Sequence, residues 1–523
     1  MLRLITSVVI GWSAVLSLSS AQNATPRTTP NDNAIQRFIS APIYHNAQWG
    51  ILIADASSGE PLFQLNSDKL FAPASTTKLF SGAAALVALG PSFRFVTPVY
   101  RQTARDSNGL QSDTLVLRAM GDPNLSGRID RDGHLKYTAE DHIYANFSNR
   151  ATLTDTDPLS TLDELAAQVA SAQIHQVKDV LVDDRLFEPA EGSGSGPTRI
   201  TPIVVNDDVF DILVTPATEV GGQANVQIRP STSYAQWDVA VKTVEATDRT
   251  EVDISEIPGR HYTVRGQISR GRAPLLRVAA VSDPTEFART LFIERLLAHG
   301  VMVDASRYAS QDAVQLPDPG EYQHMKLVAQ HTSPPFAEAL KVILKTSHNL
   351  GAGMLPSIMA AQNGERTPAA GMLREGQVLK SLGVPIETIS FGGGVGGSRA
   401  DFTTPHATVT LLQAMSRRQD FSTYEDALPI LGVDGTLFDA VGPDSPARGK
   451  AMGKTGTLVW ENLLTGKFLL LSKALAGYMT ASSGRKLLIA LFVNDVSIDR
   501  LPDDAEEQGK ALGHLCEIIY QKY

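Results

Sequence analysis

The chain has 523 residues, of which 43% are hydrophobic and 20% charged, so it is globular in composition and long enough for two to four domains. Its formal net charge of −10 argues against a nucleic-acid partner, because phosphate binding needs a basic surface. The single cysteine, Cys516, excludes an intramolecular disulfide and a cysteine zinc site, and the scattered histidines form no His-Glu-x-x-His motif, so no metal or cofactor is predicted.

The first residues predict an export signal. Arg3 precedes an uncharged run from Leu4 to Leu18, and Ser19-Ser-Ala21 has the small residues that a signal peptidase reads. Residues 1–21 are therefore predicted to be cleaved, which would leave a soluble protein outside the cytoplasmic membrane, in the periplasm. An uncleaved membrane anchor is the alternative, although the apolar run is short for a spanning helix. Gln22 to Asn33 is predicted to be a disordered lead.

A β-hairpin and a helix come next. Trp49 to Ala54 and Leu62 to Leu65 flank a turn and predict the two strands. Leu79 to Leu89 has a strong helix pattern that ends at Gly90 and Pro91. Ser75-Thr-Thr-Lys78 stands at the start of this helix, and because residues three apart share a face, the Lys78 amine is expected under the Ser75 hydroxyl. Taken alone, Ser75 could equally be an ordinary N-cap.

Residues 96–320 predict inserted, β-rich domains, with a second one near 215–275, because so long a stretch cannot be one loop. Short Val- and Ile-rich runs predict its strands at 180–182, 204–214, 226–228, 239–244 and 278–281. Pro284 to Gly300 is predicted to be helical. Glu191-Gly-Ser-Gly-Ser-Gly-Pro197 is predicted to be a flexible loop.

Two short motifs follow the insertion. Ser347-His-Asn349 lies between two apolar-periodic segments, 336–344 and 350–361, and predicts a short break between helices, where polar residues are usually caps. Gly392-x-Gly394-x-x-Gly397 matches a dinucleotide-binding fingerprint, but the helix that such a site requires does not follow, so nucleotide binding is not predicted.

The last part of the chain predicts an antiparallel sheet and a closing helix. Lys454-Thr-Gly-Thr457 lies in a predicted strand. A hairpin is predicted to turn at Ser483, so the second S-x-x-K match, which begins at this residue, lies in a turn and not at the start of a helix. A helix from Asp504 to Tyr520 should bury Cys516. Because strands and helices occur at both ends of the chain, the sequence predicts an α+β domain that is discontinuous, formed by residues 34–95 and 321–523.

Three motifs in a fixed order form a recognisable set: Ser75-x-x-Lys78, Ser347-x-Asn349 and Lys454-Thr-Gly456. Such a set is typical of enzymes whose active-site serine is acylated by penicillin or by a D-alanyl-D-alanine peptide. On these motifs the chain resembles the low-molecular-mass penicillin-binding proteins of the D-alanyl-D-alanine carboxypeptidase/endopeptidase family. Further matching stretches are Gly121-Asp-Pro-Asn-Leu125, Val182-Asp-Asp-Arg-Leu-Phe187, Val205-Asn-Asp-Asp208, Leu428 to Leu437 and Leu475-Ala-Gly-Tyr478.

The chain departs from the family pattern at several positions. His348 stands where the family usually has Asp, Gly393 and Val395 alter a D-G-S-G-L-S-R stretch, and Ala440 replaces an Arg. None is a primary catalytic position. These departures leave substrate-side detail open.

The resemblance implies a penicillin-binding, β-lactamase-like transpeptidase fold and an acyl-enzyme mechanism. Ser75 would attack the carbonyl of the penultimate D-alanine and release the terminal D-alanine. Lys78 would be the base, which requires burial and the neighbouring Lys454 charge to lower the pKa of its amine. Lys454 and Ser347 would pass the proton to the leaving amine, and Asn349 would orient Lys78 and the substrate amide.

Substrate binding is expected from the last motif and from two distant residues. The backbone amides of Ser75 and Thr457 would form the oxyanion hole. The hydroxyls of Thr455 and Thr457, on either side of Gly456, would hold the substrate carboxylate. The resemblance also implies that Asp183 and Arg399 bind the ends of a diaminopimelate-type side chain, against the alternatives of a turn aspartate and a solvated arginine.

The predicted partners are peptidoglycan stem peptides and β-lactams. Two other functions stay open: a β-lactamase, although no E-x-x-L-N stretch supplies a deacylating glutamate, and a non-catalytic penicillin-binding scaffold. The sequence does not separate carboxypeptidase from endopeptidase activity, nor does it give the third stem-peptide residue or the oligomeric state.

Overall fold

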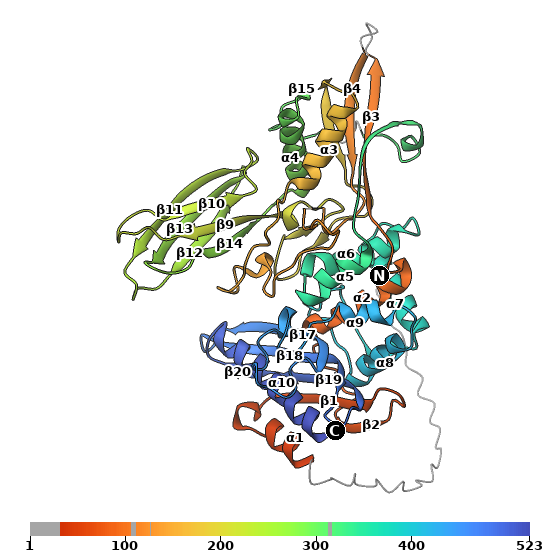
Figure 1. Cartoon of the computed structure of the whole chain (residues 1–523), viewed down its shortest axis with the longest axis vertical. Coiled ribbons are helices and arrows are strands. Elements are labelled where there is room, and N and C mark those ends of the chain that lie inside the picture. Colours follow the sequence, from red (N-terminus) through yellow and green to blue (C-terminus); the bar gives the residue numbers. More distant parts are fainter. Residues whose placement is uncertain (1–31, 106–110, 126, 312–315) are drawn as a thin grey trace, which may run out of the picture.

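The computed structural model describes residues 32–105, 111–125, 127–311 and 316–523. The predicted signal and the lead as far as residue 31 lie outside them. Asp32 and Asn33 were expected in a disordered lead, and this is wrong, because they begin the first helix. The chain forms a terminal unit, built from residues 32–95 and 333–523, and an inserted unit, residues 96–332, which lies above it in Figure 1. The predicted α+β class is confirmed.

The terminal unit takes its elements from both ends of the chain. From the first segment come α1 (Asp32–Ile39), η1 (Pro42–Tyr44), β1 (Gln48–Asp55), β2 (Pro61–Leu65), η2 (Ala74–Thr76) and α2 (Thr77–Leu89). The helices of the last segment are α5 (Phe336–Lys345), α6 (Asn349–Ala361), α7 (Pro368–Ser381), η7 (Ile386–Thr388), α8 (Pro405–Ser416), α9 (Phe421–Asp426), η8 (Gly435–Leu437) and α10 (Asp503–Lys522). Its strands are β17 (Ala451–Asn462), β18 (Lys467–Thr480), β19 (Lys486–Asn494) and β20 (Val496–Ile498).

One antiparallel sheet joins these two segments in the order β17-β18-β19-β1-β2, with β20 also paired to β18. The N-terminal strand β1 pairs along its whole length with β19, from Gln48 opposite Asn494 to Asp55 opposite Leu487. Strand β19 is apolar on both faces because helices cover both. Leu488, Ala490 and Phe492 pack in a core with α2, α5 and α8, whereas the alternate residues pack in a second core with α10.

The inserted unit is built around three larger sheets. One has the order β16-β3-β4-β6, one β10-β9-β14 and one β11-β13-β12. Their strands are β3 (Val96–Arg105), β4 (Gln111–Arg118), β6 (Asp179–Asp183), β9 (Val209–Thr215), β10 (Asn225–Arg229), β11 (Gln236–Val244), β12 (Glu251–Ile257), β13 (His261–Ser269), β14 (Leu275–Ala280) and β16 (Lys326–Thr332). The other elements are η3 (His142–Tyr144), α3 (Ser160–Ser171), β5 (Gln176–Val177), β7 (Ala190–Glu191), β8 (Arg199–Ile200), η4 (Asn206–Asp208), α4 (Pro284–Ala298), β15 (Met302–Val303) and η6 (Tyr322–His324).

A single apolar core runs through all three of these sheets and under α3 and α4. Strand β16 lies beyond the predicted boundary at residue 320 but pairs with β3, which is why the inserted unit is drawn here as far as residue 332. The division of the insertion into two domains stays a prediction. Among the helices of the described residues, none is both long and apolar enough to cross a membrane.

Candidate active site

Ser75 lies in η2, a tight turn that leads directly into α2. Pro73 precedes the turn, and Ala74 adopts a left-handed conformation with φ of 46°. The segment before it is anchored to the sheet, since Asn494 Oδ1 accepts from the Ala72 amide at 2.8 Å and the Ser472 hydroxyl donates to the Ala72 carbonyl at 2.7 Å. The serine is therefore held at a fixed place between the sheet and the helix.

Lys78 follows one turn later and is completely buried. Its Nζ lies 2.8 Å from Ser75 Oγ, 2.7 Å from Asn349 Oδ1 and 3.4 Å from Ser347 Oγ. Burial and the neighbouring Lys454 charge hold the pKa of the Lys78 amine well below its usual value. A lowered pKa favours the neutral amine, which is the form that can accept a proton.

The middle motif occupies the break between α5 and α6, as the sequence indicates. Ser347 has a left-handed backbone with φ of 62°, which is unusual for a residue other than glycine. The Tyr144 hydroxyl, which belongs to η3 of the inserted unit, donates to the Ser347 carbonyl at 2.6 Å. Tyr144 thus links the insertion to the motif, and no motif in the sequence singled it out.

The glycine- and serine-rich loop at 191–197, predicted to be flexible, contacts the motif. Asn349 Nδ2 donates to the Ser193 carbonyl at 2.7 Å and to Ser195 Oγ at 3.0 Å. Ser195 is buried. These contacts fix the amide of Asn349 so that its oxygen faces Lys78.

Strand β17 brings the last motif beside the serine. At Gly456 a side-chain Cβ would lie 2.5 Å from the Pro73 carbonyl oxygen, so only glycine lets this strand approach η2 so closely. Lys454 is completely buried, donates to the Thr455 carbonyl at 2.8 Å, and has its pKa lowered by burial to about 7. Lys454 affects Lys78 through its charge, which lowers the pKa of the Lys78 amine, and not through a direct hydrogen bond.

Lys473 is a functional candidate that the sequence analysis missed. It lies on β18 directly opposite Thr457, and its Nζ donates to Thr457 Oγ1 at 2.9 Å and to the Ala505 carbonyl at 2.9 Å. Burial lowers the pKa of its amine to about 8. The signal was its place in an otherwise apolar strand adjacent to the Lys-Thr-Gly strand, which becomes informative only once the strand register is known.

A cleft of about 1190 Å³ opens over these groups and is lined by both units. Ser75, Ser347, Asn349, Thr455 and Thr457 line its wall in the terminal unit. Residues 249–253, around the start of β12, line the opposite side. The cleft therefore lies beside the serine and between the two units.

Asp183 and Arg399 do not line the cleft with Ser75 and the other motif residues. Asp183 ends β6, where its carboxylate accepts from Arg185 Nε at 2.7 Å and from the Tyr322 hydroxyl at 2.5 Å. Arg399 stacks over the Trp460 ring, with its guanidinium carbon 4.7 Å from the ring centroid. Neither residue lines the cleft, so their assignment to the substrate stays a prediction.

Comparison with known proteins gives a consistent picture. A family model described as "D-Ala-D-Ala carboxypeptidase 3 (S13) family" matches residues 32–513. The chain is 28% identical over 486 residues to a D-alanyl-D-alanine carboxypeptidase of Actinomadura sp., a match that covers 88% of this chain and 82% of that protein. It is 25% identical over 460 residues to the D-alanyl-D-alanine carboxypeptidase DacB of Haemophilus influenzae, covering 86% and 85%.

The fold is also similar to a solved one. The crystal structure of penicillin binding protein 4 from Haemophilus influenzae superposes with a TM-score of 0.69 at 19% identity, covering 94% of this chain and 100% of that one. At this level of identity the likeness concerns the fold.

Proposed function

The chain belongs to the D-Ala-D-Ala carboxypeptidase 3 (S13) family and is a serine-type D-Ala-D-Ala carboxypeptidase, and on this premise we propose that Ser75 is its nucleophile and Lys78 its general base. One observation carries the proposal. The buried Lys78 amine lies 2.8 Å from Ser75 Oγ and 2.7 Å from Asn349 Oδ1, so it can take the serine proton while its own position is fixed.

The proposed reaction proceeds in two steps. Ser75 Oγ attacks the carbonyl carbon of the penultimate D-alanine as its proton moves to Lys78 Nζ. Ser347 Oγ, 3.4 Å from the same nitrogen, carries that proton to the departing D-alanine amine, and the nearby Lys454 charge keeps Lys78 from retaining it. Water then hydrolyses the resulting ester. β-Lactams acylate Ser75 in the first step, and the acyl-enzyme that they form resists the hydrolysis of the second step.

Two further groups would stabilise charge on the substrate. The backbone amides of Ser75 and Thr457 would bind the oxyanion, each donor contributing about 3 kcal/mol to the transition state. The hydroxyls of Thr455 and Thr457 would hold the terminal carboxylate. The close approach of β17 to η2 at Gly456 supports this arrangement, because it puts both sides of the site next to the serine.

Fluorescent penicillin tests the nucleophile. We expect the purified protein to be labelled covalently and to release the label slowly, and we expect Ser75→Ala to lose labelling. Persistent labelling of Ser75→Ala would contradict the assignment, and Ser483→Ala, which alters the second S-x-x-K match, is the matched control. Rapid turnover would favour a β-lactamase, and no labelling of the wild type would favour the scaffold.

The roles of Asp183 and Arg399 as contacts for a diaminopimelate-type side chain remain a proposal that rests on the family resemblance. D-Alanine release decides it when Asp183→Ala and Arg399→Ala are compared on a diaminopimelyl-D-Ala-D-Ala peptide and on a minimal acyl-D-Ala-D-Ala substrate. A loss confined to the longer peptide would support substrate contact. Equal losses would assign Asp183 to the contacts with Arg185 and Tyr322 that hold β6.

We propose that peptidoglycan stem peptides are the natural substrates and that residues 1–21 direct the enzyme across the cytoplasmic membrane to the periplasm. N-terminal sequencing of the exported protein should begin after Ala21. An N-terminus at Met1 in the membrane fraction would instead support the uncleaved anchor.

A further inference from the structure

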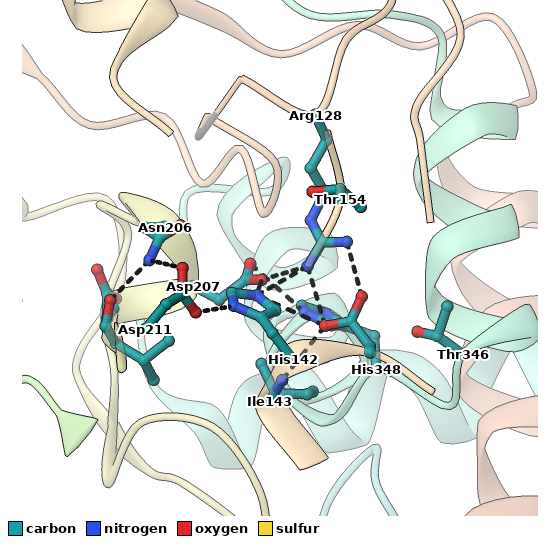
Figure 2. A network of polar contacts seen from close by, with 12 residues as sticks. Arg128, His142, Ile143, Thr154, Asn206, Asp207, Asp211, Thr346 and His348 are labelled. Atoms are coloured by element: carbon teal, nitrogen blue, oxygen red, sulfur yellow. Dashed lines mark hydrogen bonds and ion pairs between the residues drawn. The ribbon is translucent and has the colours of Figure 1, made fainter. Parts of the chain in front are cut away.

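The middle residue of the Ser347-His348-Asn349 motif points away from the cleft. His348 is 1% exposed and lies in a buried network of charged groups, most of which the inserted unit contributes (Figure 2). The side chains of its two sequence neighbours, Ser347 and Asn349, both contact Lys78. Whatever fixes His348 therefore also fixes both of these groups.

The contacts of His348 define where its proton is. The backbone amide of Gly351 donates to His348 Nδ1 at 3.1 Å, so His348 is the N-cap of α6 and the ring carries its proton on Nε2. Nε2 faces Asp207 Oδ1 at 3.4 Å, and neither of these two buried atoms has a hydrogen-bond partner among the described residues, so each is the nearest polar group available to the other. The ring bridges the start of α6 and a carboxylate of the insertion.

Asp207 is itself held rigidly. Its other carboxylate oxygen accepts from Arg128 and lies 2.6 Å from His142 Nε2. Arg128 also donates to Asp141 at 2.8 Å, and His142 Nδ1 lies 2.5 Å from Asp211. These side chains are all buried. Figure 2 shows His142 between Asp211 and the Arg128 guanidinium, with His348 beside them.

Three carboxylates, Asp141, Asp207 and Asp211, face three cationic side chains, Arg128, His142 and Arg229, the last with its Nε 2.9 Å from Asp211 Oδ2, so the network is balanced in charge without an added ion. Asp141, Asp207 and His348 lie close enough to hold a metal. However, Arg128 occupies the side of the two carboxylates that a cation would need, and the carboxylates on either side of His142 raise its pKa to about 10, which makes it a second cation. The residues fit an ionic scaffold better than a metal site.

Backbone strain occurs at both places that His348 joins. Ser347 has φ of 62°, and Asn206, Asp207 and Asp208 form three consecutive left-handed residues with φ of 52°, 53° and 52°. Such conformations persist only where surrounding contacts hold them. Two side chains link these places: the His348 ring, which faces Asp207, and Tyr144, whose hydroxyl donates to the Ser347 carbonyl and which lies in the same short turn as His142, η3.

We infer that His348 is a positioning residue for acylation, which locks Ser347 and Asn349 onto Lys78 by tying the start of α6 to Asp207 of the inserted unit. This inference rests on the proposed function of the Ser75 site. It assigns the insertion a part in the chemistry of the terminal unit. It also gives a physical reason why this chain has a histidine where the family that it resembles usually has an aspartate. An aspartate at position 348 would place a second negative charge near Asp207.

Three substitutions at His348 test separately the contact of the ring with the Gly351 amide and its contact with Asp207. His348→Asn keeps an acceptor for Gly351 but is too short to reach Asp207. His348→Gln places a donor near Asp207 but loses the cap. His348→Asp has the size of asparagine and keeps the cap, but it adds a second buried negative charge near Asp207. The acylation rate at saturating penicillin, the penicillin dissociation constant and the thermal midpoint are measured for each.

We expect the saturating rate to fall roughly tenfold in His348→Asn and in His348→Gln, and more in His348→Asp than in His348→Asn, with the dissociation constant within about twofold of wild type. Thr404→Ala, which removes the cap of α8, is the control for stability and should leave the saturating rate unchanged. Equal rates for His348→Asp and His348→Asn, or a wild-type rate in His348→Asp, would overturn the inference. Failure of the wild type to be labelled would instead overturn the proposed function.

Discussion

At the scale of single residues, the site contains three lysines whose pKa values are lowered by burial. Lys78, Lys454 and Lys473 all have lowered pKa values, and in each case desolvation is the largest cause. Only Lys78 contacts the serine. Of the other two, Lys454 lies close enough for its charge to lower the pKa of Lys78, and Lys473 lies beside the hydroxyl of Thr457.

Lys473 is expected to supply the countercharge for the substrate carboxylate, because its amine lies 2.9 Å from Thr457 Oγ1. Lys473→Met should lower kcat/KM for a D-Ala-D-Ala peptide about ten- to a hundredfold, the typical worth of a hydrogen bond to a charged group. The loss should appear mainly in KM. Since its pKa is about 8, wild-type kcat/KM should also decline as the pH rises through that value.

A substrate with an amidated C-terminus is the control for Lys473, and it should lose little in Lys473→Met. Lys473→Arg should retain part of the binding. Equal losses on the free acid and the amide would contradict the countercharge and would assign Lys473 to its contact with the Ala505 carbonyl.

Glu375 predicts a pH effect on stability. It is 1% exposed, its carboxylate oxygens have no hydrogen-bond partner among the described residues, and burial together with the Asp401 charge raises its pKa from 4.5 to about 8. Between those two values the folded protein keeps a proton that the unfolded chain has lost, so stability falls as the pH rises. Glu375→Gln should remove this slope and be more stable than wild type at pH 8 by roughly 2 to 4 kcal/mol.

Urea unfolding at pH 4 and pH 8 checks the Glu375 prediction. The exposed Glu387→Gln is the control for removing one negative charge. The same free energy of unfolding for wild type and Glu375→Gln at both pH values would contradict it.

At the scale of elements, two segments from the last part of the chain converge on the turn that holds Ser75. Strand β17 approaches it at Gly456, and the loop before α8 approaches it at Gly396, where an added Cβ would lie 1.9 Å from the Ala74 carbonyl oxygen. Gly396 also has φ of 92°, which disfavours any other residue. The Val395 carbonyl of the same loop lies 3.3 Å from Lys78 Nζ. The loop is therefore a wall of the base pocket.

Gly396→Ala should displace this wall and slow acylation by penicillin at least tenfold, because the added methyl group cannot be accommodated without moving Ala74, next to the nucleophile. Gly393→Ala, in the same loop, is the matched control, since its Cβ would meet nothing within 4 Å. Acylation rates from stopped-flow labelling compare the two. Equal acylation rates for the two variants would contradict the prediction, because they would show that the loop accommodates the methyl group without displacing Ala74.

Many elements could be predicted from the sequence, although strands such as β3, β4, β12 and β13 were not, and the contacts between distant elements could not be predicted at all. The Ser75 helix, the break at Ser347, the Lys454 strand and the hairpin at Ser483 occur where the patterns place them, because each depends on local periodicity and turn residues. The Arg128–His348 network joins segments with no shared motif, and Lys473 depends on strand register. Such contacts arise from tertiary packing, which a single sequence does not display.

At the scale of the whole molecule, both ends of the chain build one sheet and the cores on its two faces. Cys516, the single cysteine, reports on this closure, because it is 0% exposed in α10 and lies in the core beneath β1 and β19. Burial also raises the pKa of its thiol to about 12, which suppresses the reactive thiolate.

The native protein should therefore react with the thiol reagent DTNB at least about a hundredfold more slowly than the urea-unfolded protein. Release of the coloured thiolate product measures the rate. An exposed control is Ser483→Cys in a Cys516→Ser background, which should react at once. Fast reaction of the native wild-type protein would contradict the docking of α10 on the sheet.

The discontinuity of the terminal unit also sets the timing of activity during synthesis. Ser75 and Lys78 are made early, but Asn349 follows only after the whole insertion, and Gly456 and Thr457 later still. Under the proposed function, a nascent chain that ends before β17 has the proposed nucleophile and base but lacks the strand proposed to supply the oxyanion donor and the carboxylate contacts. We therefore expect the protein to be inactive during synthesis, and to become able to cleave a D-Ala-D-Ala peptide or to be acylated by a β-lactam only when its final strands have paired with its first.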